Sequence, residues 1–456
     1  MRYLPLTPSE EKKILNDCGV KNFSDLLDSV PPDLRLKGNL KTGVAQSEEE
    51  LIETFESYAA NIKAAQMISF LGQGAYDHTW PKVIDQLINR GEFLTAYTPY
   101  QPEISQGTLQ SIFEFQSLIA EITGMEISNA SLYDGSTALL EAILMSARLQ
   151  KKEKGVILVS EGTYPSTLEL LKTYLEPLNI QIHIWKADSK TYLSTENTLD
   201  YNDTQNILGV ALQSPNKWGL IEDWAEAVKS AQKLKTKSSA STFQIHSLTE
   251  FASPGEAGID IVSGEGQALG IPVGFGGPYL GLLCCKKSDV RQLPGRLVGL
   301  TEDSKGQRAF CITLSTREQH IRREKATSNI CSNQNLMALR AAMYTTLMGP
   351  QGLLELSQTL RAKLEYFQKS IESKLKKGKI IQGSALNEIS LMIGTLTEDQ
   401  IKNFEKDSFN EGLICGVFNK EPISLNSNNL LLTIAITERH SKNNLDKLAD
   451  FLSRHF

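Results

Sequence analysis

The middle of the chain reads Asp260-Ile-Val-Ser-Gly-Glu-Gly-Gln-Ala-Leu-Gly-Ile-Pro-Val-Gly-Phe-Gly-Gly-Pro278. An apolar run followed by closely spaced glycines indicates a buried strand that leads into a tight turn. The amide of Gln267 follows the strand, and no lysine occurs from Ser238 to Cys285. Because an amide cannot form an imine with an aldehyde, this turn offers no group for covalent catalysis of that kind.

The length and composition of the chain set its broad class. With 456 residues it is long enough for two or three domains with a substantial core. The net charge of -6 and the lack of a dense basic stripe argue against a nucleic-acid partner. No segment reaches about 18 consecutive apolar residues, and residues 1–13 hold no apolar run of signal-peptide length. We therefore expect a soluble, cytoplasmic protein without a membrane partner.

The cysteines and histidines are scattered along the chain. The six cysteines form no CxxC pair, and the adjacent Cys284 and Cys285 fall inside an apolar, strand-like run. Dispersed thiols without a secretion signal are typical of reduced core residues. The six histidines include no HExxH motif. We expect no disulfide and no metal site.

Residues 1–70 are predicted to form a helical arm rather than a compact domain. Thr7-Pro8-Ser9-Glu10 is a capping box that begins one helix, and Ser47-Glu48-Glu49-Glu50 begins another. Pro31-Pro32 separates the two. The second helix carries an apolar face made of Leu51, Ile52, Phe55, Tyr58 and Ala59.

Residues 71–335 alternate between helices and short apolar strands. Strands are expected at 156–159, 182–185 and 208–212, with a crossover helix over 166–174. Strands separated by helices imply a mostly parallel sheet that is covered on both faces. The predicted fold class is α/β, with this region as the large domain.

Residues 336–456 are predicted to form a smaller α/β domain. The expected elements are helices over 336–347 and 353–375, strands at 389–393, 413–417 and 430–436, and a closing helix over 445–452. The order along the chain is therefore arm, large domain, small domain.

Gly135-Ser136-Thr137 stands at the start of a helix rich in alanine and leucine. Free backbone N–H groups, two hydroxyls and the positive end of the helix dipole suit a phosphate, so Ser136 and Thr137 are candidate cofactor-binding residues. An ordinary N-cap needs the same residue types, and the sequence leaves both interpretations open.

Gly264-Glu-Gly266-Gln-Ala-Leu-Gly270 could be mistaken for a dinucleotide-binding fingerprint. Its spacing is GxGxxxG, and Ile271-Pro272 follows where a helix should begin. The chain also lacks a Walker A sequence and a GxSxG nucleophile elbow. No nucleotide site is predicted.

Two segments are candidates for contact with the active site or interface of a partner. Residues 95–103 present two tyrosines on a backbone stiffened by two prolines, which suits an active-site loop and equally a packed inter-domain loop. Residues 316–329 carry arginines that could bind a carboxylate or a partner chain, although a solvated helix face has the same composition. The candidate residues are Tyr97, Thr98, Tyr100, Glu103, Arg317, His320, Arg322, Arg323 and Lys325.

Several long strings closely resemble the amino-terminal half of the glycine cleavage system P-protein family. In many bacteria this half is a separate chain, glycine dehydrogenase (decarboxylating) subunit 1. The resemblance runs over the whole sequence. The matching strings are Phe93-Leu-Thr-Ala-Tyr-Thr-Pro-Tyr-Gln-Pro-Glu-Ile-Ser-Gln-Gly107, Ser128-Asn-Ala-Ser-Leu-Tyr-Asp-Gly-Ser-Thr137, Gly274-Phe-Gly-Gly-Pro278, Gly295-Arg-Leu-Val-Gly299 and Arg317 through Cys331.

The resemblance implies fold type I of the pyridoxal-phosphate (PLP) aminotransferases and a heteromeric enzyme, glycine dehydrogenase (aminomethyl-transferring). The family decarboxylates glycine with PLP as the electron sink and passes the aminomethyl group to the lipoyl arm of the H-protein. In the split form the second subunit carries the Schiff-base lysine and holds the cofactor. Gln267 stands at that position here, so the resemblance implies no catalytic residue in this chain. It further implies pseudo-symmetric pairing of the two subunits in an α2β2 heterotetramer.

The chain departs from its relatives over Phe243–Phe251. This segment is more polar than the family pattern, and it offers no aspartate to pair with a pyridine nitrogen. The departure is a second missing cofactor contact.

Two other functions stay open. The chain could be a regulatory or scaffold subunit that contributes no residue to any active site. It could also be a self-sufficient PLP decarboxylase that uses another lysine. The nearest candidates are Lys286 and Lys287, but they follow the next strand and stand too late in the chain.

Overall fold

The computed structural model describes residues 6–274, 276–328, 330, 333–376 and 378–456. The chain divides into two compact units, Met1–Ala65 and Gln66–Phe456. The second unit begins just before strand β1 (Ile68–Ser69), which pairs in parallel with β13 (Leu413–Ile414). The predicted boundary between a large and a small domain at residue 335 stays a prediction.

The first unit is a series of short helices. They are α1 (Pro8–Asp17), η1 (Phe23–Leu27) and α2 (Glu48–Ala60). Both predicted capping boxes are present, at Thr7 and at Ser47. On α2, Phe55 is 62% exposed and Tyr58 is 63% exposed. Within the first unit, the predicted apolar face of this helix is therefore left uncovered.

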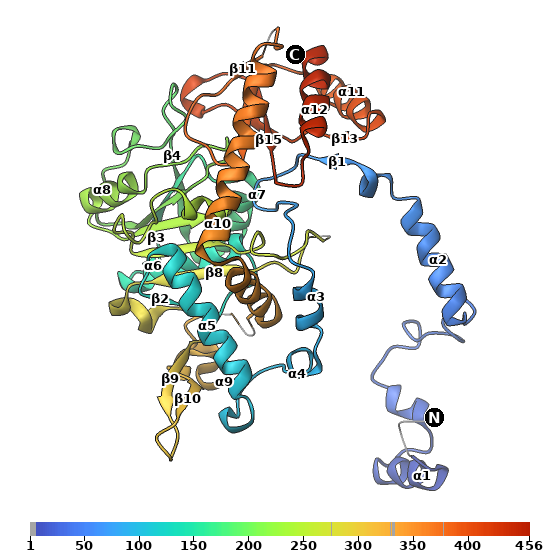
Figure 1. Cartoon of the computed structure of the whole chain (residues 1–456). Coiled ribbons are helices and arrows are strands. Elements are labelled where there is room, and N and C mark those ends of the chain that lie inside the picture. Colours follow the sequence, from blue (N-terminus) through green and yellow to red (C-terminus); the bar gives the residue numbers. More distant parts are fainter. Residues whose placement is uncertain (1–5, 275, 329, 331–332, 377) are drawn as a thin grey trace. The chain divides into compact units, whose positions relative to one another are not determined.

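The second unit contains a seven-stranded sheet of order β2-β8-β7-β6-β5-β3-β4 (Figure 1). Neighbouring strands from β7 to β4 are parallel, and β8 is antiparallel to β7 and to β2. The prediction of a mostly parallel sheet is confirmed. The strands are β2 (Ile127–Ser128), β3 (Gly155–Ser160), β4 (Ile180–Trp185), β5 (Ile207–Gln213), β6 (Ser238–Thr242), β7 (Ile261–Glu265) and β8 (Gly281–Cys285).

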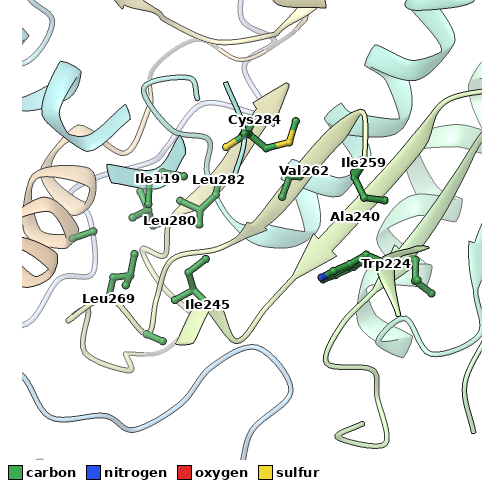
Figure 2. Close-up of a cluster of buried hydrophobic side chains, with 14 of the residues drawn as sticks. Ile119, Trp224, Ala240, Ile245, Ile259, Val262, Leu269, Leu280, Leu282 and Cys284 are labelled. Atoms are coloured by element: carbon green, nitrogen blue, oxygen red, sulfur yellow. The ribbon is translucent and has the colours of Figure 1, made fainter. Parts of the chain in front are cut away.

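Both faces of this sheet are buried. Alternate side chains of each strand point to opposite faces, and other parts of the chain cover both sets. On β3, Ile157 and Val159 pack with residues of α6 (Gly135–Leu149) and α7 (Pro165–Leu175). Leu158 packs on the opposite face. The core of that face includes Trp224, Val262 and Leu282 (Figure 2). It also takes residues from α5 (Gln106–Thr123), α8 (Trp224–Leu234) and α10 (Asn335–Glu372).

A second sheet is antiparallel and has the order β11-β12-β15-β14. Its core residues are shared with the last helices of the chain. The elements are β11 (Lys379–Ile380), β12 (Glu388–Gly394), β14 (Val417–Lys420), β15 (Leu430–Ala435), α11 (Glu398–Asn410) and α12 (Lys442–His455).

Two features of the carboxyl-terminal region differ from the sequence expectation or refine it. The single strand predicted at 413–417 is wrong: β13 and β14 pair with different strands, and Gly416 between them has φ 144°. A Cβ at Gly416 would collide with the Thr433 carbonyl oxygen, so only glycine allows this break. The two helices predicted over 336–375 form α10, which is interrupted at Gly349 (φ 62°), directly before Pro350.

The remaining elements of the described chain are short. The hairpin of β9 (Val298–Glu302) and β10 (Arg308–Ile312) was not predicted. The short helices α3 (Val83–Ile88), α4 (Gly91–Leu94) and α9 (Gln319–Arg322) lie outside the sheets. Within the ranges given above, no helix has the length and apolar character needed to cross a membrane.

Candidate functional site

Gln267 follows the end of strand β7 and is 1% exposed. Its side-chain oxygen accepts a hydrogen bond from the Tyr76 N–H at 2.8 Å, and its side-chain nitrogen donates to the Tyr76 carbonyl at 3.0 Å. The same nitrogen donates to the Ile271 carbonyl at 2.6 Å. The amide is therefore fully engaged by three backbone groups, two of which belong to Tyr76, 191 residues away in the sequence.

Glu265 is the last residue of β7 and is 2% exposed. One carboxylate oxygen accepts from the Gly135 N–H at 2.8 Å. The other accepts from the N–H groups of Gln267 and Leu280, both at 2.9 Å. Burial raises the pKa of this carboxyl to about 8, although the three backbone donors act in the opposite direction.

The amino-terminal end of helix α6 binds side chains of the chain itself. Asp134 is the N-cap residue, and its carboxylate accepts from the Thr137 N–H at 2.9 Å. The Ser136 hydroxyl lies 2.8 Å from the Thr167 hydroxyl, and the Thr137 hydroxyl donates to the Asp134 carbonyl at 3.1 Å. The predicted candidates Ser136 and Thr137 thus use their hydroxyls within the chain.

Aromatic side chains fill the space beside these groups. The Phe243 ring packs edge-on against Tyr164, with the ring centroids 5.1 Å apart. A Cβ at Gly135 would lie 2.7 Å from the Phe243 ring, so only glycine fits beneath it. The Tyr164 hydroxyl lies 3.3 Å from that of Tyr76, and both tyrosines are at most 1% exposed. We call Tyr76, Tyr164, Phe243, Glu265 and Gln267 the closed cleft.

The segment that the sequence marked as lacking an aspartate follows strand β6. Its Gln244 is fully buried, and the side-chain amide lies 3.3 Å from Nε2 of His78. Nδ1 of His78 lies 2.7 Å from the Glu438 carboxylate. Burial lowers the pKa of the neighbouring His246 to about 3, which keeps that imidazole neutral. A neutral amide therefore stands here among hydrogen-bonded groups, next to a neutral imidazole.

The segment through Tyr76 also reaches the second sheet. Glu388 of β12 accepts from the Gln73 N–H at 2.8 Å and is 1% exposed. Burial raises the pKa of the Glu388 carboxyl to about 7. Residues 73–78 therefore connect Gln267 in one sheet region with Glu388 and Glu438 in the other.

The closed cleft does not fit PLP. An imine needs an amine where Gln267 stands, and a phosphate needs the helix N–H groups that Glu265 and Asp134 already occupy. The Phe243 ring lies against the same helix start. We therefore derive no catalytic step in this cleft.

The two segments predicted to contact a partner meet at Tyr100 and His320. Their rings pack edge-on with centroids 5.3 Å apart. The Arg296 guanidinium lies 5.6 Å from the centre of the Tyr100 ring and 3.8 Å from the Glu318 carboxylate. Arg296, from the loop before β9, thus helps to join the two segments. It was not predicted from the sequence as a site residue.

The predicted partner-contact residues differ in exposure. Arg317 is buried, and its guanidinium donates to the carbonyls of Leu293, Leu314 and Gly295, the last two at 3.0 and 3.2 Å. The Thr98 hydroxyl is buried, with no hydrogen-bond partner among the described residues. We call the exposed residues the tyrosine–arginine surface: Tyr97, Tyr100, Glu103, His320, Arg322, Arg323 and Lys325.

Tyr97 is 78% exposed, and the adjoining Ile104 is 79% exposed. Arg323 has a φ of 54°, which is uncommon for a side chain of its size and marks a constrained turn. Exposed aromatic and aliphatic side chains beside cationic ones are typical of interfaces. Whether these residues contact a partner stays a prediction.

Four residues of the site, Glu265, Phe243, Tyr76 and Tyr164, were not predicted from the sequence. A signal for Glu265 was present, because a carboxylate at the end of an apolar, buried strand needs hydrogen-bond donors. No comparable signal exists for Tyr76, whose contact with Gln267 is made only by the folded chain.

Two predictions concern cysteines and metals: that the chain has no disulfide and that it has no metal site. Cys18, Cys284, Cys285, Cys311 and Cys415 are free thiols, and Cys331 lies outside the described residues. Where residues are described, no group of three His, Cys, Asp or Glu side chains is arranged to hold a metal ion. For the whole chain, the absence of a metal stays a prediction.

Comparison with known proteins places this geometry in a family context. A "Probable glycine dehydrogenase (decarboxylating) subunit 1" from Moorella thermoacetica is 41% identical over 449 residues, which cover 98% of each chain. A protein of the same name from Bacillus cereus is 44% identical over 375 residues, 82% of this chain and 83% of that one.

Two solved structures extend the comparison to the fold. The crystal structure of glycine decarboxylase (P-protein) of the glycine cleavage system, in inhibitor-bound form, matches over 100% of both chains. Its TM-score is 0.85 at 35% identity. Lactobacillus brevis glutamate decarboxylase has a TM-score of 0.68 at 13% identity over 94% of this chain and 97% of that one, which shows a shared fold. The fold is that of the PLP-dependent enzymes of fold type I.

The family model described as "Glycine cleavage system P-protein" matches residues 1–452. The match covers both units of the chain, including the closed cleft and the tyrosine–arginine surface. The chain therefore belongs to the glycine cleavage system P-protein family.

Proposed function

We propose that this chain is the non-lysine subunit of a heteromeric glycine decarboxylase. Together with a second, lysine-bearing subunit it binds glycine and releases CO2. The complex transfers the remaining aminomethyl group to the lipoyl arm of the H-protein. The chain itself supplies no covalent catalyst.

One observation carries this proposal: Gln267 stands at the end of β7 and is fixed to the backbone of Tyr76. In a chain of this family and fold, such a residue leaves no amine for an imine at that place. Relatives that match nearly the whole length are named as subunit 1, and this name implies a second subunit.

We assign PLP to the second subunit and propose an α2β2 assembly. The assignment rests on the poor fit of the closed cleft, where Glu265 occupies the helix N–H group that a phosphate would need. It also rests on the likeness to fold type I enzymes. When bound to the second subunit, PLP supplies the electron sink for decarboxylation.

The contribution of this chain to the shared active site is assigned to its tyrosine–arginine surface. Tyr97 and Tyr100 would present hydroxyl groups on a loop stiffened by prolines. The guanidinium groups of Arg322 and Arg323 suit a carboxylate, either of glycine or of the partner chain. Thr98, His320 and Lys325 lie in the same two segments, whereas the buried Arg317 supports the surface from within.

The test is reconstitution from purified subunits. The isolated chain should release no CO2 from carboxyl-labelled glycine in the presence of PLP and lipoylated H-protein. Activity should appear when the second subunit is added, and it should saturate at a fixed ratio of the two chains. Decarboxylation by this chain alone would contradict the proposal, and so would full activity of the second subunit alone.

The structure gives no support to a self-sufficient decarboxylase. Lys286 lies beside Asp260, with its Nζ 2.7 Å from the carboxylate, at the opposite end of β7 from Glu265. It therefore cannot take the place of an amine near Gln267. Borohydride reduction of the isolated chain with PLP, followed by peptide mapping, should reveal no single modified lysine.

A further inference from the structure

The start of helix α6 combines the features of a phosphate site with an occupant from the same chain. The first helical N–H group, that of Gly135, donates to the Glu265 carboxylate at 2.8 Å. The third, that of Thr137, donates to the Asp134 carboxylate at 2.9 Å. A bound phosphate at a helix start uses these same donors and the same end of the dipole.

Glu265 is held in this place by more than one donor. Its two oxygens accept three backbone hydrogen bonds of 2.8 to 2.9 Å, and the side chain is 2% exposed. The donors come from the α6 start, from the turn at Gln267 and from the residue before β8. A carboxylate with this set of donors is fixed in position, because moving it would leave all three N–H groups unpaired in the interior.

The donors of the site are already occupied. A phosphate would have to displace Glu265 and Asp134 from the N–H groups that they bind at the same helix end. Because burial raises the pKa of the Glu265 carboxyl to about 8, its occupation of these donors, rather than a negative charge, keeps a phosphate out. A Cβ at Gly135 would lie 2.7 Å from the Phe243 ring and 2.8 Å from Cβ of Glu265, so both side chains pack closely against the helix start.

We propose that the Glu265 carboxylate is a built-in substitute for the cofactor phosphate, so that the α6 start binds neither PLP nor free phosphate until this carboxylate is removed. The inference concerns the isolated chain and does not depend on the proposed decarboxylase function. Phosphate binding and reconstituted activity are separate measurements, so failure of one is distinguishable from failure of the other.

Removal of the carboxylate should convert the site into an anion site without restoring a cofactor site. In Glu265→Ala, the N–H groups of Gly135, Gln267 and Leu280 lose their acceptor, and an inorganic phosphate oxygen can replace it. The Phe243 ring and the Gln267–Tyr76 pair remain in place. PLP should therefore bind this variant no more tightly than inorganic phosphate does.

The experiment compares wild type, Glu265→Ala and Glu265→Gln with a matched control, Glu222→Ala. Glu222 is also a buried carboxylate, 3% exposed, that accepts from the Ser194 N–H at 3.0 Å and from the Asn216 amide at 2.8 Å. It does not contact a helix start. Binding of inorganic phosphate is measured by titration calorimetry, and the rise in Tm with phosphate is compared with chloride at equal ionic strength.

We expect phosphate to bind Glu265→Ala at least about tenfold more tightly than wild type or Glu222→Ala. The specific rise in Tm should appear in the same variant only, because the general salting effect of phosphate is common to all four proteins. Circular dichroism checks that each variant is folded, and Glu265→Gln, which keeps the side-chain volume and an acceptor oxygen, should bind phosphate no better than wild type.

Three results would overturn the proposal. The first is one-site binding of phosphate or PLP to the wild-type chain with a Kd in the micromolar range. The second is a folded Glu265→Ala that binds phosphate no better than wild type. The third is equal gain of phosphate binding in Glu222→Ala, which would trace the effect to loss of any buried carboxyl group. If both Glu265 variants fail to fold, titration of wild type still decides the first point.

Discussion

The closed cleft and the tyrosine–arginine surface belong to one chain, but their side chains differ in exposure and in hydrogen bonding. In the cleft, Glu265 and Gln267 are at most 2% exposed, and their polar atoms bind backbone groups of the chain. On the surface, Tyr97 is 78% exposed. Glu265 and Gln267 are thus part of the core, whereas the side chains of the tyrosine–arginine surface are exposed.

The contrast bears on how the proposed non-lysine subunit would keep its fold without a cofactor. A cleft built for a cofactor would leave unpaired donors and a cavity if it were simply emptied, and both destabilise a protein. Here Glu265 accepts from the donors, and Phe243 occupies space at the helix start. The cleft therefore contributes to stability, and we expect mutations there to act on folding and mutations on the surface to act on assembly and activity.

The largest effect is expected for Gln267→Leu. The substitution leaves the Tyr76 N–H and the Ile271 carbonyl without these partners in the interior, whereas the Tyr76 carbonyl keeps the hydrogen bond from the His78 N–H at 2.9 Å. The free energy of unfolding should fall by about 3 kcal/mol or more. Denaturant unfolding of the isolated chain measures it. Gln351→Leu is the control, because Gln351 makes only an exposed contact with Glu355; a similar loss in both variants would contradict the role given to Gln267.

The next effect concerns activity rather than stability. Tyr97→Ala and Tyr100→Ala should lower kcat/KM of the reconstituted enzyme about tenfold or more, while the isolated chain keeps its stability within about 0.5 kcal/mol. The control is Tyr174→Ala, which removes a tyrosine of α7 that is 56% exposed. Full kcat/KM in the variant that carries both changes would instead favour the scaffold function for this chain.

A smaller effect should follow pH through Glu388. Burial raises its pKa from 4.5 to about 7, so the folded state holds this proton more tightly than the unfolded state. The stability contributed by Glu388 is present below about pH 4.5 and is lost as the pH rises through about 7.

Glu388→Gln cannot ionise, so it should gain on wild type across this window, by about 2 kcal/mol at pH 8 relative to pH 4.5. The measurement is the free energy of unfolding of both proteins over that range. A difference between the two that does not change with pH would show that Glu388 keeps one charge state throughout.

The smallest effect is expected at the exposed cations. Arg322→Ala and Lys325→Ala should slow association with the second subunit about two- to fivefold at low salt, and the difference should vanish at high salt. The rate can be followed by stopped-flow fluorescence on mixing the subunits. Lys190→Ala removes an exposed cation from another part of the chain and serves as the control. Equal slowing by all three changes would assign the effect to net charge alone.

Much of the fold could be predicted from the sequence, because its signals are local. The strands β3, β5 and β15, the helix α7 and both capping boxes follow from runs of apolar residues and from capping residues a few positions apart. The split of the strand at 413–417 could not be foreseen, since the crowding that requires Gly416 comes from Thr433 on another strand.

In the candidate site, too, some features can be predicted from the sequence and others can be seen only in the structure. The missing amine at Gln267 is visible in the order of residues, and the Gly-Ser-Thr start of α6 is equally visible. The use of that helix start was left open between a phosphate and a cap, and the structure gives its donors to Asp134 and Glu265. Arg317 was grouped with exposed arginines because charge runs do not reveal burial, yet its guanidinium binds three carbonyls in the interior.

The order of amino acids alone determined that no lysine stands near Gln267, because a functional group that is not encoded at a position cannot be supplied by folding. The alternation of apolar runs likewise determined the α/β class, since side-chain periodicity acts between near neighbours. Only the tertiary structure decided that Glu265, Phe243 and the backbone of Tyr76 surround the end of β7 and the start of α6. These contacts join residues more than 100 positions apart in the sequence, and their energies exist only when the sheet, the helix and the preceding loop have come together.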